Sequence, residues 1–490
     1  MGEINLNPQN SRGAWIAAGI VLIIAAMSIY IRAGEILNPE ADAYLVCHLS
    51  DRPYLSKILC PHLNDADDYM ARPVSHFFEN IDAHLFYFFY SLGIPHFISI
   101  VTTVMLIFLS AAIWFCATNY AKASPAIATL MLALLWTNPN VFFAGNLFRD
   151  AKIAATFFFI LGGVYSFRFI LRNHPCRFRD FVIIFTLALL ACLSDPQGFA
   201  FVTILSSIVL VWAFVTVSRP AYVSFFSGFC ASLTYLVLSV FVLPKLVAKY
   251  TWFNTHSAFA NYQHGVADNF IKYLWDGILL HLDTLRFLFG NVPRIVIAAG
   301  LVLLCIAIFK LTSHRLLIGF CFILLLLETF AMDGAMVARH SALMWPGVMR
   351  GGYYQLPSVV LFFTTILFIL PSVCESFRIP KSALVALLTI AICANLVALP
   401  DHMKVRAGGP FAGYFISAPF LRAELVFISK TVPAGPALPY DARSASNSAT
   451  KYYMLEPDKI DLQRSIEIYI NTSRIYSFLR SEKGLPYNKP

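Results

Sequence analysis

The chain has 490 residues, of which 58% are hydrophobic and 13% are charged, and its mean hydropathy is +0.68. A soluble protein has about 25% charged residues, so this composition excludes an ordinary soluble fold and predicts an all-α multi-pass membrane protein. The net charge of +9 comes from dispersed Lys and Arg residues without a basic run, which argues against a nucleic-acid partner.

The first 95 residues predict one membrane-spanning helix and one long loop. Segment 1–32 ends in an apolar run without a small-residue cleavage site, and we interpret it as a tail and a retained first transmembrane helix. Segment 33–95 is predicted to be an acidic exterior loop with interfacial helices. Its part 83–95 is either an interfacial helix or the start of the second span. Cys47 and Cys60 in this loop are either a disulfide or two unpaired apolar residues.

Segment 96–399 is predicted to be a transmembrane bundle of about ten helices, which makes about 11 with the first. The apolar runs lie near 14–32, 96–118, 124–142, 152–171, 180–194, 198–217, 221–243, 294–312, 315–332, 354–372 and 382–399. An exterior loop at 245–293 contains an amphipathic pattern at 267–290. Segment 400–490 has strand-like runs and predicts a small exterior α/β domain.

The distribution of basic residues predicts the orientation. With the N-terminus in the cytoplasm, most Lys and Arg of the short loops fall on the inner side, whereas loop 33–82 has nine acidic against three basic residues. An odd number of spans then places the C-terminus outside. We expect the membrane to be a bacterial inner membrane.

An acidic cluster precedes the second apolar region. Asp65, Asp67 and Asp68 are followed by Arg72 and Pro73, and the fixed φ of proline favours a helix beginning there. The simple interpretation is a solvated acidic loop. A carboxylate beside the membrane is also suited to act as a general base on an acceptor hydroxyl, or to hold a divalent cation such as Mg²⁺ or Mn²⁺ against a diphosphate.

Three further residues fall at predicted outer ends of spans. Arg149 and Asp150 either form a mutual salt bridge or belong to a site, because an interfacial charge is unfavourable unless it is paired or used. Asp195 is most simply an Asp-Pro turn residue. Its position nevertheless adds a carboxylate to the outer face.

The loop after the ninth span offers donors for an anion. Arg339, His340 and Arg350 lie in this loop, followed by Tyr353 and Tyr354. The arginines are suited to bind a lipid phosphate, although snorkelling at a helix end explains them as well. His340 alone is more typical of a structural role. Since the sequence has no nucleotide-binding motif, a group transferred on the outer face must arrive on an activated carrier, as polyprenyl-phosphate sugars do.

Three stretches resemble integral-membrane glycosyltransferases of the GT-C class. The acidic pair in the first exterior loop with ARPVSHFFENIDAHLF is similar to the catalytic acid and the R-P-(L/V)-S stretch of some members. MRGGYYQLPSVV is similar to their R-x-x-Y-x-x-L-P segment, and KYYMLEPDKI looks like part of an appended exterior domain. The tightly spaced Arg-Tyr-Leu-Tyr of the clearest members is missing after the ninth span.

The resemblance implies roles for these residues. Asp67 or Asp68 would be the base or a metal-linked acid, and Arg350, or Arg339 in its place, would bind the donor phosphate with Tyr353 and Tyr354. Supporting roles would fall to the remaining candidates, which are Arg72, His76, Arg149, Asp150, Asp195 and His340. The reaction would transfer a sugar to a glycan, lipid or protein acceptor in one inverting displacement.

Three other classes of function remain open. A transporter or flippase of lipid-linked glycans needs similar exterior charges, and a polymerase or ligase of such glycans places two arginines in exterior loops. A non-catalytic assembly subunit is the third alternative. Transporters commonly have internal repeats and charges at the membrane midplane, and the sequence has no convincing repeat.

Overall fold

A computed structural model describes about half of the chain. The described residues are 53–59, 72–92, 98–119, 122–138, 150–172, 177–216, 219–250, 292–309, 356–376 and 378–406, with the single residues 23, 45, 48, 49, 141, 145, 148, 275, 279 and 282. Within these residues the secondary structure is helical, without strands. The fold is therefore all-α over the part that the structure describes.

The helices have the following bounds: α3 Tyr54–Leu59, α4 Pro73–Ser91, α5 Ile100–Asn119, α6 Pro125–Trp136, α8 Ala151–Arg172, α9 Phe178–Ser194, α10 Pro196–Thr216, α11 Arg219–Val237, η1 Leu238–Val242, α12 Leu243–Tyr250, α15 Arg294–Phe309, α18 Leu356–Ser376 and α19 Lys381–Arg406. Proline is the first residue of α4, α6 and α10, where its fixed φ suits a helix and its missing N–H is not needed.

Several helices have the character of membrane spans. Three described stretches are long and apolar enough to cross a bilayer, namely Ile100–Asn119, Pro196–Phe214 and Pro220–Leu246. Shorter apolar stretches occur in α6, α8, α15, α18 and α19. Many large apolar side chains face outward, among them Phe108, Phe214 and Val397. Such surfaces are expected where lipid replaces water as the solvent.

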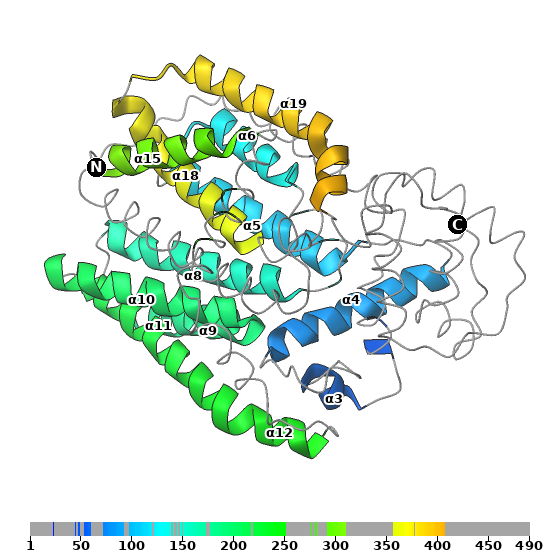
Figure 1. Ribbon diagram of the computed structural model, residues 1–490. Helices are drawn as coiled ribbons and strands as arrows, with labels where there is room; N and C mark the ends of the chain where they lie inside the picture. Colours follow the sequence, from blue (N-terminus) through cyan, green and yellow to red (C-terminus); the bar gives the residue numbers. More distant parts are fainter. Residues whose placement is uncertain are drawn as a thin grey trace, which may run out of the picture.

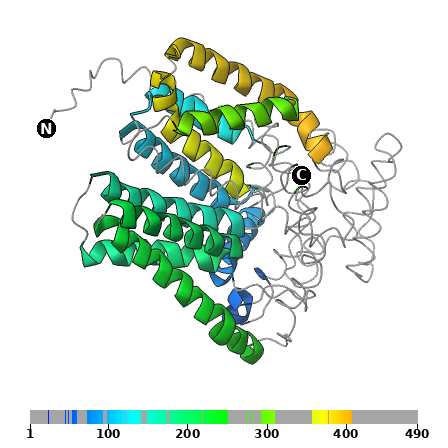
Figure 2. The same cartoon turned by 60° about the vertical axis from the view of Figure 1, so that its left-hand side comes forward.

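Helix α8 is the centre of the bundle. It packs against α9, α10 and α11 on one side and against α5 and α18 on the other. The first group continues into α12, and the second includes α6, α15 and α19; both views separate these two groups (Figures 1 and 2). Residues of α5, α6, α8, α10 and α18 share one large hydrophobic core.

Small residues allow two close helix contacts. A Cβ at Gly198 would collide with the carbonyl group of Ala191, so the turn from α9 into α10 requires glycine. A Cβ at Gly228 would collide with the side chain of Ser206, so glycine brings α11 close to α10. The first contact fixes the position of Asp195 between the two helices.

The helix that starts at Arg219 contains one π-helical turn. The amide of Leu243 donates to the carbonyl of Leu238, five residues earlier, and η1 joins α11 to α12. Pro244 follows directly and cannot donate an amide hydrogen, which disfavours regular α-helical bonding here. Beyond this turn α12 packs against α3.

The predicted apolar runs in the described part of the chain are helices, of which three stretches are long and apolar enough to span. Each of the apolar runs from 96–118 to 221–243, and the runs 294–312, 354–372 and 382–399, corresponds to one helix, with η1 completing the run 221–243. Helix α6 ends at Trp136, well before the predicted end of its run at residue 142. Residues 83–91 belong to α4, separately from α5, so they continue an additional helix. The predicted spans 14–32 and 315–332, the amphipathic helix, the Cys47–Cys60 pair and residues 407–490 lie outside the described residues or almost entirely so. Helix α19 continues to Arg406, past the predicted domain boundary at 400.

Candidate active site at one end of the bundle

Most of the buried charged side chains in the described residues gather at one end of the bundle. There α5, α8 and α10 begin, α9 ends, and α4 packs against α5, α8 and α9. Both views place α4 at this end (Figures 1 and 2). Successive helices alternate in direction, so the topology predicts one common side for Arg72, Asp150 and Asp195. All three residues lie at this end of the bundle.

Asp195 joins α9 to α10 and binds two cations. Its Oδ1 accepts a hydrogen bond from Lys152 Nζ at 2.7 Å and another from the backbone amide of Gln197 at 2.9 Å. Its Oδ2 lies 3.8 Å from Nη1 of Arg72. The three charged side chains are 9% exposed or less. Asp195 is therefore both the residue of an Asp-Pro turn and the acceptor in a buried ion-pair cluster.

The two cations keep this carboxylate ionised. Burial alone would raise the pKa of Asp195, but the charges of Lys152 and Arg72 outweigh it and lower the pKa. A guanidinium and an ammonium group held together in this way are suited to bind a phosphate.

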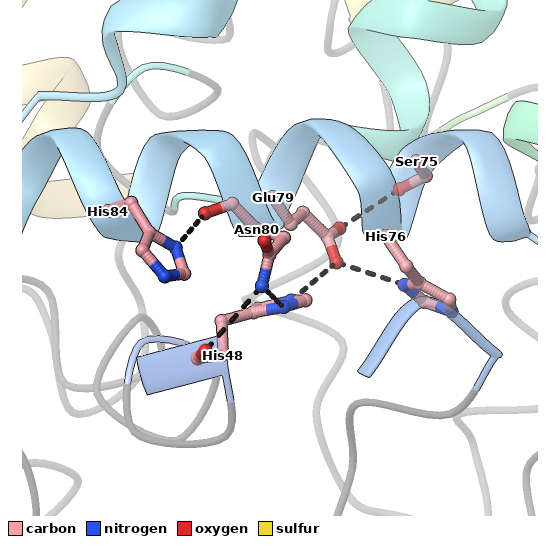
Figure 3. A network of polar contacts seen from close by, with 6 residues as sticks. All are labelled: His48, Ser75, His76, Glu79, Asn80 and His84. Atoms are coloured by element: carbon pink, nitrogen blue, oxygen red, sulfur yellow. Dashed lines mark hydrogen bonds and ion pairs between the residues drawn. The ribbon is translucent and has the colours of Figure 1, made fainter. Parts of the chain in front are cut away.

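A second cluster lies along α4 and is centred on Glu79 (Figure 3). Glu79 Oε1 accepts a hydrogen bond from Ser75 at 3.0 Å, and Oε2 accepts one from His76 Nδ1 at 3.0 Å. His48 Nε2 lies 3.6 Å from the same Oε2, at ion-pair rather than hydrogen-bond distance. Asn80 binds the other ring nitrogen of His48 at 3.3 Å. The cluster attaches the segment that contains His48 to α4.

The charge of Glu79 determines how the imidazole of His76 is protonated. Burial would raise the pKa of Glu79, but the contacts with His48 and His76 lower it well below its ordinary value. An ionised carboxylate only accepts hydrogen bonds, so Nδ1 of His76 must be the donor. Burial lowers the pKa of His76 more strongly than Glu79 raises it, so its imidazole stays neutral with Nε2 deprotonated. Arg72, four residues before it, lowers that pKa further.

A third cluster contains two buried carboxyl groups at the start of α5. Asp82 Oδ1 accepts from the amides of Ile100 at 2.9 Å and Val101 at 3.3 Å. Asp150 Oδ1 accepts from Thr102 Oγ1 at 2.6 Å and from the Ser99 hydroxyl at 3.3 Å. These bonds fix α4, α5 and α8 to one another.

Among the described residues, no basic group is in ion-pair contact with either carboxyl. Burial raises the pKa of Asp82 to about 7. Burial, together with the neighbouring charge of Asp82, raises the pKa of Asp150 well above its ordinary value. The two groups therefore differ from Asp195, which lies at the same end of the bundle but is held ionised by cations.

Four of the predicted site residues lie in the described part of the chain. Arg72 and Asp195 are in ion-pair contact, His76 lies one turn after Arg72, and Asp150 belongs to the neighbouring carboxyl cluster. The remaining predicted site residues lie outside the described residues; they are Asp67, Asp68, Arg149, Arg339, His340, Arg350, Tyr353 and Tyr354. Asp67 and Asp68 are also the predicted metal ligands. Among the described residues no group of three or more His, Cys, Asp or Glu side chains is placed to hold a metal ion.

Sequence reasoning missed four members of these clusters. Lys152 has the clearest signal, because a lysine in the first turn of an apolar run needs a partner or a function. Glu79 was available through its spacing of three residues from His76 on a helix. Asp82 entered the prediction only as one of the nine acidic residues of loop 33–82. His48 has no distinguishing sequence signal.

Over the described residues, the structure is an all-α bundle with apolar helices that fit a membrane protein and a buried polar site at one end. Comparisons with models of protein families, with curated proteins and with solved structures found no match to this chain. The functional conclusion therefore depends on the chemistry of the site.

Proposed function

We propose that the protein is a membrane glycosyltransferase that transfers a sugar from a polyprenyl-phosphate-linked donor to an acceptor on the non-cytoplasmic face. The observation that carries the proposal is the pair of buried cations, Arg72 and Lys152, on either side of Asp195 at the end of the bundle. A lipid-linked donor presents its phosphate at the end of an apolar bundle, and such a position needs cations that are held in place.

The proposed arrangement places the acidic pair beside these cations along the chain. Asp68 precedes Arg72 by only four residues in the sequence. In the proposed reaction Arg72 and Lys152 bind the donor phosphate, with Arg350 or Arg339 as further ligands. Asp67 or Asp68 removes the proton from the acceptor hydroxyl, alone or with a divalent cation.

The proposed chemistry is a single displacement. The acceptor oxygen forms a bond to the anomeric carbon while the bond from that carbon to the phosphate oxygen breaks, and polyprenyl phosphate leaves with the electron pair. The acceptor proton goes to the carboxylate base. The configuration at the anomeric carbon is inverted, and no covalent enzyme intermediate is needed.

The proposal also includes the membrane topology. About eleven spans, a cytoplasmic N-terminus and an exterior C-terminal domain in a bacterial inner membrane are consistent with the basic inner loops of the sequence. The described helices support the membrane character through their length and apolar composition.

The test is sugar transfer by the full-length protein in lipid nanodiscs, supplied with polyprenyl-phosphate sugars. Asp67→Asn, Asp68→Asn and Lys152→Met are compared with Lys122→Met, a matched change in the described turn between α5 and α6. We expect Lys152→Met and one of the Asp variants to lose about 100-fold or more in transfer while they fold normally, and Lys122→Met to keep full activity. Transfer that is unchanged in all variants would refute the assigned roles.

A transporter of lipid-linked glycans is the second candidate. It is favoured by the Asp82–Asp150 pair, which has no cation in ion-pair contact among the described residues, because such buried carboxyl groups are typical of proton-coupled carriers. Liposomes that contain the protein separate the two functions. Movement of an intact lipid-linked glycan between leaflets, without a new glycosidic bond, would favour the transporter.

A further inference from the structure

The two carboxyl groups at the start of α5 are incompletely bonded. Asp82 and Asp150 are both fully buried, at 0% exposure. Each uses its Oδ1 for the hydrogen bonds that hold α4 and α8 to α5. Within the described residues, Oδ2 of Asp82 and Oδ2 of Asp150 are buried without a hydrogen-bond partner. A buried acceptor without a partner is unfavourable and calls for an additional group.

Among the described residues, the charges around the pair do not supply that group. Helix α5 has no Asp, Glu, Lys, Arg or His. On the surrounding elements, Lys152 of α8 is bound to Asp195, and Glu79 of α4 is bound to His48 and His76. The neighbouring charges that act on the pair are acidic, since Glu79 repels both carboxylates.

A metal ion does not fit what the pair offers. Magnesium requires six ligands in octahedral geometry and calcium six to eight oxygens. The pair has two oxygens left, and its other two accept hydrogen bonds from backbone amides and hydroxyls. Both carboxyls bond to residues 99–102 at the start of α5, and a proton on one Oδ2 removes a negative charge there and converts an unpaired acceptor into a donor.

We propose that Asp82 and Asp150 form a proton-binding site that holds one proton between them, and that this proton stabilises the packing of α4 on α5 and α8. Loss of the proton leaves two ionised carboxylates buried at the start of α5, and their repulsion weakens the packing of the elements that carry them. Helix α4 begins directly after Arg72 and contains His76. The coupling of this proton to sugar transfer rests on the proposed function, whereas the proton site itself does not.

The first experiment uses infrared difference spectroscopy on the full-length protein labelled with ¹³C at the aspartate side-chain carboxyls. We expect wild type at neutral pH to show a protonated aspartic C=O band that shifts on deuteration and on labelling. We expect the band to be lost in Asp82→Asn and in Asp150→Asn, and to remain in Asp180→Asn, whose aspartate lies at the opposite end of the bundle. The absence of such a band in wild type at neutral pH would overturn the proposal, and this result does not depend on the folding of a variant. So would a band that persists in both variants of the pair.

The second experiment measures hydrogen exchange in α4. After correction for the intrinsic effect of pH, we expect exchange at residues 73–91 to accelerate at least several-fold above neutral pH, while α10 changes little. Asp82→Asn should remove the acceleration, because the variant keeps one carboxyl of the pair and therefore has no repulsion between two carboxylates at any pH. Protection of wild-type α4 that is independent of pH would refute the coupling. Neither measurement uses activity, so a protein without glycosyltransferase activity can still confirm the proton site.

Discussion

Replacement of Lys152 by methionine tests the buried ion-pair cluster. Methionine is similar in length to lysine and occupies the space of its methylene chain. The change removes the ammonium group that donates to Asp195 at 2.7 Å. The Asp195 carboxylate then retains Arg72 at 3.8 Å and the amide of Gln197 at 2.9 Å. The variant therefore weakens a buried charge pair without removing every partner of the carboxylate.

The distances from Asp195 to Lys152 and to Arg72 determine the loss of stability that we expect for Lys152→Met. At an effective dielectric constant of about 20, attractions over 2.7 Å and 3.8 Å amount to about 6 and about 4 kcal/mol, so Lys152 supplies more than half of the gross attraction. Removing one partner of a buried pair typically costs about 3–5 kcal/mol. Since Arg72 remains, we expect the lower end of that range, about 3 kcal/mol, for Lys152→Met. Asp195→Asn leaves two buried cations and should cost more.

The assay is unfolding in mixed micelles with an increasing fraction of denaturing detergent. Both single variants, the double variant and Lys122→Met are compared with wild type. We expect the double variant to lose less stability than the sum of the single losses, with a coupling energy of about 2 kcal/mol or more. Lys122→Met should change stability by less than about 0.5 kcal/mol. Single losses that add to within about 0.5 kcal/mol would show that Lys152 and Asp195 do not interact.

Three further outcomes follow from the same geometry. Asp82 binds its proton more tightly in the folded chain, where its pKa is about 7 against 3.8 for the free group. The free energy of unfolding should therefore fall by up to about 4 kcal/mol as the pH rises from about 4 to about 7. Asp82→Asn should flatten this pH dependence, and an unchanged dependence in the variant contradicts the assignment. Glu79→Gln should cost about 2–3 kcal/mol in the same assay, because Ser75 and His76 lose a charged acceptor and His48 loses a charge at 3.6 Å. A loss below about 0.5 kcal/mol argues against the network. Gly198→Ala should cost at least about 1–3 kcal/mol of stability, because the added Cβ collides with the Ala191 carbonyl in α9. Gly300 in α15 has open space around it, so Gly300→Ala should stabilise the protein by up to about 1 kcal/mol. Equal effects of the two changes would refute the close contact at Gly198.

The helices themselves were predictable from hydropathy. Each apolar run in the described part became one helix, because backbone groups in an apolar solvent must bond within their own segment. The start of α4 at Pro73 followed from the fixed φ of proline. The placement of Arg72, Asp150 and Asp195 at one end followed from the alternation of spans, since loops on the same side of a bundle share an end.

The partners of the charged residues were not predictable in the same way. Lys152 and Asp195 are 43 residues apart, and their contact depends on how α8 packs against the junction of α9 and α10. That packing is set by small residues such as Gly198, whose effect depends on the neighbouring helix rather than on the local sequence. Hydropathy records how much of a segment is buried, but it does not record which side chains face one another.

The same limit separates two kinds of buried carboxylate that look alike in the sequence. Asp150 and Asp195 both occur at a helix end, next to a span, and within a few residues of a basic side chain or an amide. Packing gives Asp195 two cations and a lowered pKa, whereas it gives Asp150 hydroxyl donors, an acidic neighbour and a raised pKa. One carboxylate is thereby fixed in its charged form beside candidate phosphate ligands, and the other is made able to bind a proton. An ionised group that orders cations and a titratable group that holds a helix are different functional elements, and only the three-dimensional contacts distinguish them.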